Sequence, residues 1–315
     1  MKRLIWGGIV GLIVCWLVSC GKPPRSRNEM ASFAINNAGD VAFSFFHQNR
    51  EALYLWTAAD QIARQITAPN GESAFLHPSF SRDGRQLVFI RYTSRAPYIC
   101  EVWVLEVHRS APRVIASIHG IVRQVIFDDA GADVFCIVAR DYAAYSPLAG
   151  KAPHGFDLFR VGVDDGKIQQ VTSLNAYEMS GLTPGPDGTV LCRIVVGERA
   201  GIYRIDPDRP DAPQPLELHV AGRPDRMLYF SPDYSVGRRE LLFVVPYEIY
   251  VSAIESGEAR LVFSNVGKEP IEQVRWFGNQ VMFSTSANDR LYVLPLLGGE
   301  VRELSLTFPT TQGSR

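Results

Sequence analysis

The chain has 315 residues, of which 46% are hydrophobic and 21% are charged, so it can bury a large core and is neither disordered nor collagen-like. Its formal net charge of -1 gives no overall electrostatic attraction toward nucleic acid. The 26 glycines and 20 prolines are spread along the whole chain, which indicates many turns between short strands in one repetitive unit.

The first twenty residues have the pattern of a secretory signal. Two basic residues precede an uncharged apolar run from Leu4 to Val18, shorter than the ~20 residues that a membrane-spanning helix needs. The run ends in Leu-Val-Ser-Cys at positions 17–20, which resembles a bacterial lipobox. This resemblance implies cleavage before Cys20 and a diacylglycerol on its thiol. An uncleaved signal anchor is the alternative interpretation.

These features predict a signal peptide at 1–19 and a lipidated tether at 20–30. The expected location is the bacterial cell envelope. Gly21 rather than aspartate follows the cysteine, which by resemblance to sorted lipoproteins favours the outer membrane, facing the periplasm. In a host with a single membrane, the expected location is the outer face of the plasma membrane.

From Phe33 onward, short apolar strands alternate with glycine-containing turns. The clearest unit runs from His77 to Ile90 and consists of a strand, an Asp-Gly turn and a second strand. Six such units recur about every 45 residues, and each is followed by a third strand and a short fourth strand. Four strands per repeat are typical of propeller blades, and a ring of six closes the sheet edges. We therefore predict an all-β, six-bladed β-propeller of four-stranded antiparallel blades over 31–306, followed by a tail at 307–315.

Three parts of the repeat carry a family resemblance: the Pro-x-Phe-Ser-x-Asp-Gly segment at 78–84, the aromatic third strand at 102–105 and the Arg-Gln-Ile-Thr fourth strand at 64–67. Together they resemble the TolB-type, WD-like propeller repeat. The same repeat builds the non-catalytic propeller of prolyl-oligopeptidase-type enzymes. Those proteins carry a further α/β domain, for which this chain has no room, so a lone propeller is expected.

Known catalytic motifs are missing from the sequence. It contains no Gly-x-Ser-x-Gly, His-Glu-x-x-His, Cys-x-x-Cys or phosphate-binding loop, which favours a non-enzymatic protein without a cofactor.

A propeller enzyme could still build a site in its central channel, and the repeat register indicates which positions would line it. They are His77, Gln124 and Gln273, together with Ser32, Gly181 and Met227. This set holds one histidine and no acid, so it predicts no metal site. His77 is expected to cap a strand or to hydrogen-bond in the channel.

Acidic pairs occur at 128–129, 164–165 and 206–208. They fall where hairpin turns are expected, and aspartate is favoured there because it bonds its own backbone. We prefer this interpretation to acid–base or calcium chemistry.

Three cysteines follow the signal segment: Cys100, Cys136 and Cys192. An odd number cannot pair completely. Two of them, Cys136 and Cys192, hold the second-strand position that Phe89 holds in the second unit. Buried thiols between blades are therefore expected, with a disulfide as the alternative.

Two neighbouring units have unusually long and aromatic connections between their second and third strands. The third unit carries an insertion, Asp141–Gly155, and the corresponding segment of the second unit is also aromatic. Both loops should emerge on the same rim as the connections between blades. Because tyrosine and arginine often anchor interfaces, the candidate partner-binding residues are Tyr92, Arg95, Tyr98, Tyr142 and Tyr145. Two variable surface loops without a function are the alternative.

Two functions from different classes fit these observations. The first is a membrane-tethered, non-enzymatic lipoprotein whose propeller binds an envelope protein or peptide. The second is a propeller enzyme, a hydrolase or lyase acting on sugars or lactones, with channel acids outside the predicted register. A binder of small ligands or glycans fits the same features as the first function.

Overall fold

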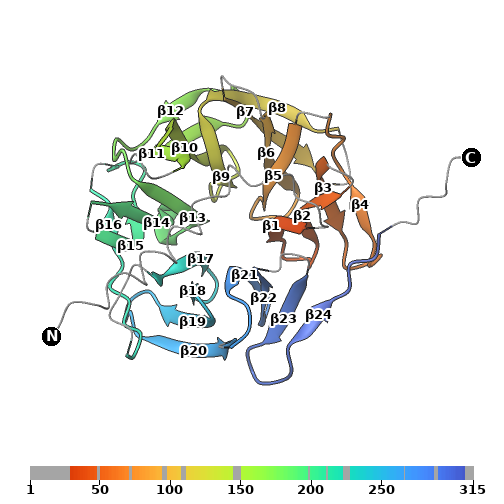
Figure 1. Ribbon diagram of the computed structural model, residues 1–315, viewed down its shortest axis with the longest axis vertical. Helices are drawn as coiled ribbons and strands as arrows, with labels where there is room; N and C mark the ends of the chain where they lie inside the picture. The colour runs from red at the N-terminus through yellow and green to blue at the C-terminus, as the bar shows by residue number, and fades with distance from the viewer. Residues whose placement is uncertain are drawn as a thin grey trace, which may run out of the picture.

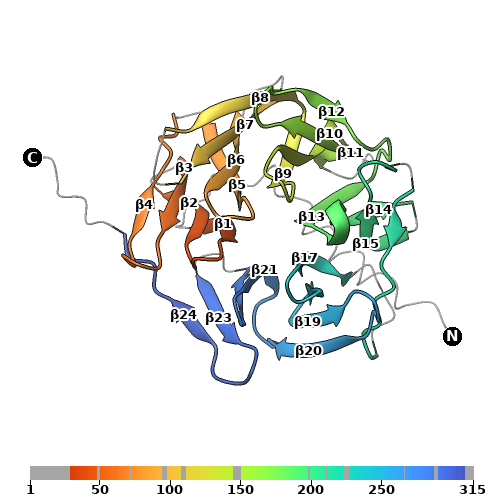
Figure 2. The same ribbon diagram turned by 180° about the vertical axis from the view of Figure 1, so that it is seen from behind.

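The computed structural model describes residues 29–47, 50–70, 73–93, 98–107, 111–144, 150–197, 199–210, 212–222, 228–265, 267–286 and 290–308. Over these residues the chain forms six four-stranded antiparallel sheets arranged as a ring (Figure 1). The predicted six-bladed β-propeller is confirmed. The ring is seen from behind in Figure 2.

Each of the first three blades is built from four consecutive strands. Blade 1 contains β1 (Glu29–Ile35), β2 (Val41–His47), β3 (Arg50–Trp56) and β4 (Ala63–Gln65). Blade 2 contains β5 (Ser73–Phe80), β6 (Gln86–Thr93), β7 (Ile99–Glu106) and β8 (Arg113–His119). Blade 3 contains β9 (Ile121–Phe127), β10 (Asp133–Ala144), β11 (Lys151–Gly162) and β12 (Ile168–Gln170).

The other three blades repeat this plan. Blade 4 contains β13 (Glu178–Pro184), the 3-10 turn η1 (Pro186–Gly188), β14 (Val190–Val196), β15 (Arg199–Ile205) and β16 (Gln214–Pro215). Blade 5 contains β17 (Phe230–Ser235), β18 (Glu240–Val245), β19 (Glu248–Ala253) and β20 (Ala259–Ser264). Blade 6 contains β21 (Ile271–Phe277), β22 (Gln280–Thr285), β23 (Leu291–Pro295) and β24 (Arg302–Leu304).

The second strand of each blade is apolar on both sides because each side packs against a neighbouring blade. In β6, Leu87 and Phe89 pack against blade 1, while Val88 and Ile90 pack against blade 3. Successive side chains of a strand point to opposite faces, so an unbroken apolar run fills two seams at once. A buried apolar cluster occupies each of the six seams between blades.

An aromatic pair repeats at the centre of four blades. Its second-strand phenylalanine stacks on a third-strand aromatic ring, as Phe89 does on Trp103 with ring centroids 6.3 Å apart. In blades 3 and 4 the phenylalanine position is held by Cys136 and Cys192, opposite Phe159 and Tyr203. Both cysteines are buried and free, as expected from the repeat register.

Among the described strands, none is exchanged between the first and last blades where the ring closes. Instead, the segment after β24 runs beside β4, where Thr307 accepts a hydrogen bond from the Ala63 amide at 2.8 Å (Figure 1). The Phe308 ring then packs on Phe45 and Tyr54, with centroids 5.1 and 5.4 Å apart. The first two residues of the predicted tail therefore belong to the closing seam.

The signal segment and Cys20 lie outside the described residues. Within those that are described, no helix is long and apolar enough to cross a membrane.

Candidate functional site

The first strand of every blade lines the central channel and carries a β-bulge near its middle. A bulge adds residues to one strand of a pair and so re-aims their side chains. The bulged residues are Ala31, His77, Pro78, Arg123, Gly181, Leu182, Ser231, Pro232 and Glu272. Most of them line a cavity of about 200 Å³ at the ring axis, which receives side chains from all six blades.

Two bulges hold a non-glycine residue in a left-handed backbone conformation. His77 has a φ of 54° and Ser231 a φ of 47°, and each is followed by a proline. These residues lie in blades 2 and 5, which face each other across a ring of six. Left-handed backbone at such residues is strained and persists only where the surroundings enforce it.

The three predicted channel residues His77, Gln124 and Gln273 all line this cavity. Ser32 and Gly181 line it too, whereas Met227 lies outside the described residues. In blade 5 the cavity is lined by Phe230 and Ser231 instead.

The carboxamides of Gln124 and Gln273 hold neighbouring blades together. Gln124 accepts a hydrogen bond from the Leu182 amide at 2.8 Å and donates to the Leu182 carbonyl at 2.9 Å. Ser32 and Ser231 act in the same way with their hydroxyl oxygens, which accept from the amides of His77 at 3.0 Å and Val274 at 3.1 Å. Leu182 and His77 are bulged residues, so Gln124 and Ser32 satisfy backbone groups that the bulges take out of the ladder.

The predicted set of channel positions holds no acid, but it is incomplete, since Glu178 and Glu272 also line the cavity, together with Arg123 and Arg275. The predicted register aligned His77 with Gln124 and Gln273. In blades 3 and 6 the bulge adds one residue to the first strand. The added residues, Arg123 and Glu272, directly precede Gln124 and Gln273, and they turn toward the axis.

Glu178 is the centre of a buried ion pair at the start of β13. Its Oε2 lies 2.8 Å from Nη1 of Arg193, and the two side chains are only 16% and 5% exposed. Arg123 lies 3.9 Å from the other carboxylate oxygen. Burial raises the pKa of Glu178, but Arg193, Arg123 and hydrogen bonds outweigh burial and hold the pKa below its usual value.

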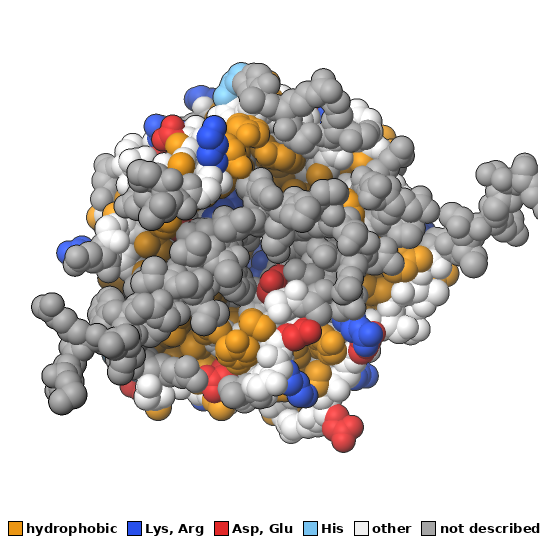
Figure 3. Space-filling model, viewed as in Figure 1, with side chains coloured by type: hydrophobic (Ala, Val, Ile, Leu, Met, Phe, Trp, Pro, Cys, Tyr) orange, Lys and Arg blue, Asp and Glu red, His pale blue; other side chains and the backbone are white. Residues whose placement is uncertain are grey.

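A second charged pair lies where blades 5 and 6 meet. Asp233 accepts a hydrogen bond from the Trp276 amide at 2.7 Å, and burial raises the pKa of its carboxyl although Arg275 opposes this. Burial also lowers the pKa of Arg275, which Asp233 opposes in turn. The channel therefore contains charges of both signs, which Figure 3 shows at the middle of the ring. Over the described ranges, no group of three His, Cys, Asp or Glu side chains could hold a metal ion.

The structure describes three of the five candidate rim residues. The Tyr92 and Tyr98 rings stack with centroids 6.4 Å apart, and Tyr142 of blade 3 meets Tyr98 edge-on at 5.2 Å. These three residues, named the tyrosine cluster from here on, also pack against the apolar cluster between blades 3 and 4. Arg95 and Tyr145 lie outside the described residues.

The insertion at 141–155 is not the loop that the sequence predicts. Strands β10 and β11 extend into it from both sides, pairing Asp141 with His154 and Ala144 with Lys151. Its glycine, proline and alanines are poor strand formers and suggested a loop, but the two segments complete each other's hydrogen bonds and form a β-hairpin arm.

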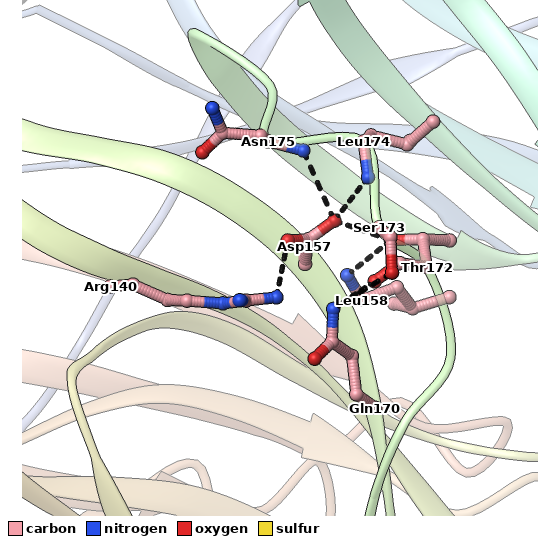
Figure 4. Close-up of polar contacts among 8 residues, drawn as sticks. All are labelled: Arg140, Asp157, Leu158, Gln170, Thr172, Ser173, Leu174 and Asn175. Carbon is pink, nitrogen blue, oxygen red and sulfur yellow. Dashed lines mark hydrogen bonds and ion pairs between the residues drawn. The ribbon is translucent and has the colours of Figure 1, made fainter.

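A buried carboxylate fixes the base of this arm (Figure 4). Asp157 of β11 binds Nη2 of Arg140 at 2.8 Å and accepts hydrogen bonds from the Thr172 hydroxyl at 3.1 Å and the Leu174 amide at 2.6 Å. It thereby ties the arm to the segment that leads into blade 4. On the same side, the His154 ring stacks on Tyr177 at 5.4 Å.

The acidic pairs act as turn residues, as expected. Asp128, Asp165 and Asp206 each accept a hydrogen bond from a nearby backbone amide at 3.0 Å. Several aspartates from these turns also line a cavity of about 270 Å³ between blades 3 and 4, with Arg160 among them.

Comparison with known proteins adds a likeness of fold. No family model and no curated protein matches the chain. Among solved structures, TolB from Acinetobacter baumannii matches with a TM-score of 0.57 and 14% identity over 85% of this chain and 66% of that one, so this chain spans just under two thirds of it. A TolB protein from Agrobacterium tumefaciens matches with a TM-score of 0.60 and 16% identity, over 81% and 88% of the two chains. An oligogalacturonate lyase from Vibrio parahaemolyticus matches with a TM-score of 0.58 and 15% identity, over 88% and 77%.

These matches define the class of protein as a six-bladed β-propeller with TolB proteins among its structural relatives. The TolB-type resemblance is confirmed as a resemblance of fold. Because the relatives include a lyase as well, the fold does not decide between a binding protein and an enzyme.

Proposed function

We propose that this protein is a membrane-tethered propeller lipoprotein whose rim binds a protein or peptide of the cell envelope. The observation that carries this proposal is the tyrosine cluster, in which Tyr98 of blade 2 and Tyr142 of blade 3 meet at 5.2 Å. One member of the cluster, Tyr142, belongs to the β-hairpin arm that is fixed at its base by Asp157. Half-buried, pre-positioned tyrosines offer a large contact area and lose little rotational freedom on binding.

The tether part of the proposal rests on the lipobox-like sequence that ends at Cys20. The expected result is that Cys20→Ala moves the protein from the membrane to the soluble fraction. A variant that stays in the membrane after a carbonate wash would instead favour the uncleaved anchor.

The rim is tested by affinity capture from membranes with the intact lipoprotein, followed by binding measurements on the captured partner. Truncating Tyr98 or Tyr142 to Ala should weaken binding by about 2 kcal/mol. Tyr203→Ala is the matched control, because Tyr203 packs against the same apolar cluster but lies in blade 4. Equal binding by the parent and by folded rim variants contradicts the proposal.

A second candidate function, a channel enzyme, is favoured by the acids that line the cavity. His77, Glu178 and Glu272 could supply proton transfer there. The test is turnover of an oligogalacturonate and of a lactone, with Glu272→Gln as the variant that should abolish it. A turnover rate equal to the uncatalysed rate rejects this function.

A further inference from the structure

Arg275 brings a positive charge to the channel without a close carboxylate. Its Nη1 donates to the neighbouring Val274 carbonyl at 2.9 Å. Within the described part of the chain, no carboxylate oxygen lies within 4.0 Å of its guanidinium nitrogens. Asp233 acts on it only from a greater distance, and its carboxylate already accepts bonds from the Trp276 amide and the Thr183 hydroxyl.

The other guanidinium groups near the axis differ from Arg275 in this respect. Arg193 and Arg123 both lie within 4 Å of Glu178. A guanidinium has five N–H donors to satisfy, and the longer-range interaction with Asp233 leaves those of Arg275 without a carboxylate of the described residues at hydrogen-bond distance. The cavity that Arg275 lines has room for a carboxylate.

Two hydroxyl groups line the same cavity as this guanidinium. The Ser231 oxygen accepts from the Val274 amide at 3.1 Å, so its O–H group remains available as a donor to the cavity. Ser284, opposite Gln273 on β22, also lines the cavity and is only 5% exposed. A planar fork of N–H donors, with hydroxyl donors lining the same cavity, matches the oxygens of a carboxylate.

We propose that the central channel binds the carboxylate group of a small ligand, with Arg275 as its anchor and the hydroxyls of Ser231 and Ser284 as further donors. Because Glu178 and Glu272 line the same cavity, a singly charged carboxylate meets less repulsion there than a phosphate group of about -1.5 to -2. The site goes beyond the proposed rim function and is separate from the tyrosine cluster. Its carboxylate can come from a free small acid or from the C-terminus of a peptide.

Titration calorimetry with four compounds tests the proposal: N-acetylglycine, acetyl-triglycine with a free C-terminus, the same peptide as its amide, and inorganic phosphate. The free acids should bind at least tenfold more tightly than the amide and than phosphate. A peptide that binds at least tenfold more tightly than N-acetylglycine identifies the C-terminus of a peptide as the source. Comparable affinities identify a free small acid.

Variants assign the effect to the proposed residues. Arg275→Gln should weaken binding of the free acids at least tenfold, and Arg275→Lys should retain part of it because the charge stays while the planar fork is lost. Arg260→Gln is the matched control, since Arg260 lies on outer strand β20 with a side chain 56% exposed. Glu272→Gln should strengthen binding, because it removes a like charge from the cavity.

The proposal is overturned if no free acid binds the folded parent, if acid and amide bind equally, or if phosphate binds more tightly. Equal binding by the parent and by Arg275→Lys and Arg275→Gln also overturns it. Should Arg275→Gln fail to fold, the Arg275→Lys and Glu272→Gln variants still test whether the channel binds a carboxylate. Tyrosine-cluster variants should bind the acids normally, so the two proposals fail separately.

Discussion

Gln273 of blade 6 and Phe33 of blade 1 share two hydrogen bonds across the seam where the ring closes. The Phe33 amide donates to Oε1 of Gln273 at 3.2 Å, and Nε2 of Gln273 donates to the Phe33 carbonyl at 2.8 Å. Gln124 makes the same pair of bonds to Leu182 between blades 3 and 4. The two seams differ in that only blades 3 and 4 are also joined by the chain.

We predict that Gln273→Ala and Gln124→Ala each lower the free energy of unfolding by about 2 kcal/mol, because each loses two hydrogen bonds of about 1 kcal/mol. Only Gln273→Ala should speed hydrogen exchange in β1 and β21, since no covalent link holds that seam. Urea unfolding and amide exchange provide the measurements. Equal exchange in the two variants would show that the closing seam is no weaker than the others.

The ion pair of Glu178 should make stability depend on pH. The pKa of Glu178 in the folded ring lies below the ordinary value of 4.5, so its contribution is complete above pH 4.5 and is lost as pH falls through the folded pKa. Glu178→Gln should cost about 3 kcal/mol at neutral pH, because Arg193 keeps a buried charge without its partner. The difference from the parent should shrink below pH 4.

This experiment compares variant and parent at each pH, because Asp233 contributes with the opposite sign. The raised pKa of Asp233 adds stability as pH falls through it, in both proteins alike. Glu300→Gln, at an exposed position, serves as the control. A Glu178→Gln effect that is constant from neutral to acid pH would rule out the ion pair as its cause.

The C-terminal segment should contribute to closure through Phe308. Its ring contacts Phe43, Phe45 and Tyr54 but stays 37% exposed, so Phe308→Ala should lower the free energy of unfolding by about 1 to 2 kcal/mol. Leu297→Ala, at a position 93% exposed, should change it little. Thermal melting measures both, and equal melting temperatures would mean that the segment does not support the ring.

The three buried thiols should be inert. Burial raises the pKa of Cys100 to about 11 and that of Cys192 to about 12, and it raises that of Cys136 as well. At pH 8 roughly one Cys100 in a thousand is then a thiolate, which is the reactive form. Iodoacetamide should label none of the three in a folded chain with Cys15 and Cys20 replaced by Ser, and all three in denaturant. Rapid labelling of the folded chain would indicate that a seam opens.

The sequence was sufficient to predict the fold because its repeat is local. Each blade's turn, aromatic third strand and short fourth strand are contiguous, so even Cys136 could be aligned with Phe89. The residues that line the channel were harder to predict from the sequence, because a bulge depends on backbone geometry and left no signal in the repeat. Glu272 was missed for this reason. Glu178 lies before its bulge, at the start of β13 and outside the positions that the repeat register selects, and its partner Arg193 lies on the next strand.

The hairpin arm shows a second limit of prediction from the sequence. Ala143 and Ala144 have weak strand propensity, and only pairing with the other side of the arm keeps them extended. The tyrosines could be placed together from the repeat plan alone, because equivalent connections emerge at the same end of every blade. Their contact between Tyr98 and Tyr142 agrees with that plan.

The point at which β1 begins has a consequence for access from the membrane. Glu29 pairs with Phe46 near the β2–β3 turn, at the end of the blade that corresponds to the hairpin arm in blade 3. Eight residues separate it from Cys20, and the nine steps between the two residues span about 30 Å when fully extended. With the proposed lipid in place, the tyrosine cluster and the channel mouth would lie on the side facing the bilayer. The gap between the ring and the bilayer would be no wider than one small domain. The rim would therefore select for partners that are anchored in, or emerge from, the same membrane.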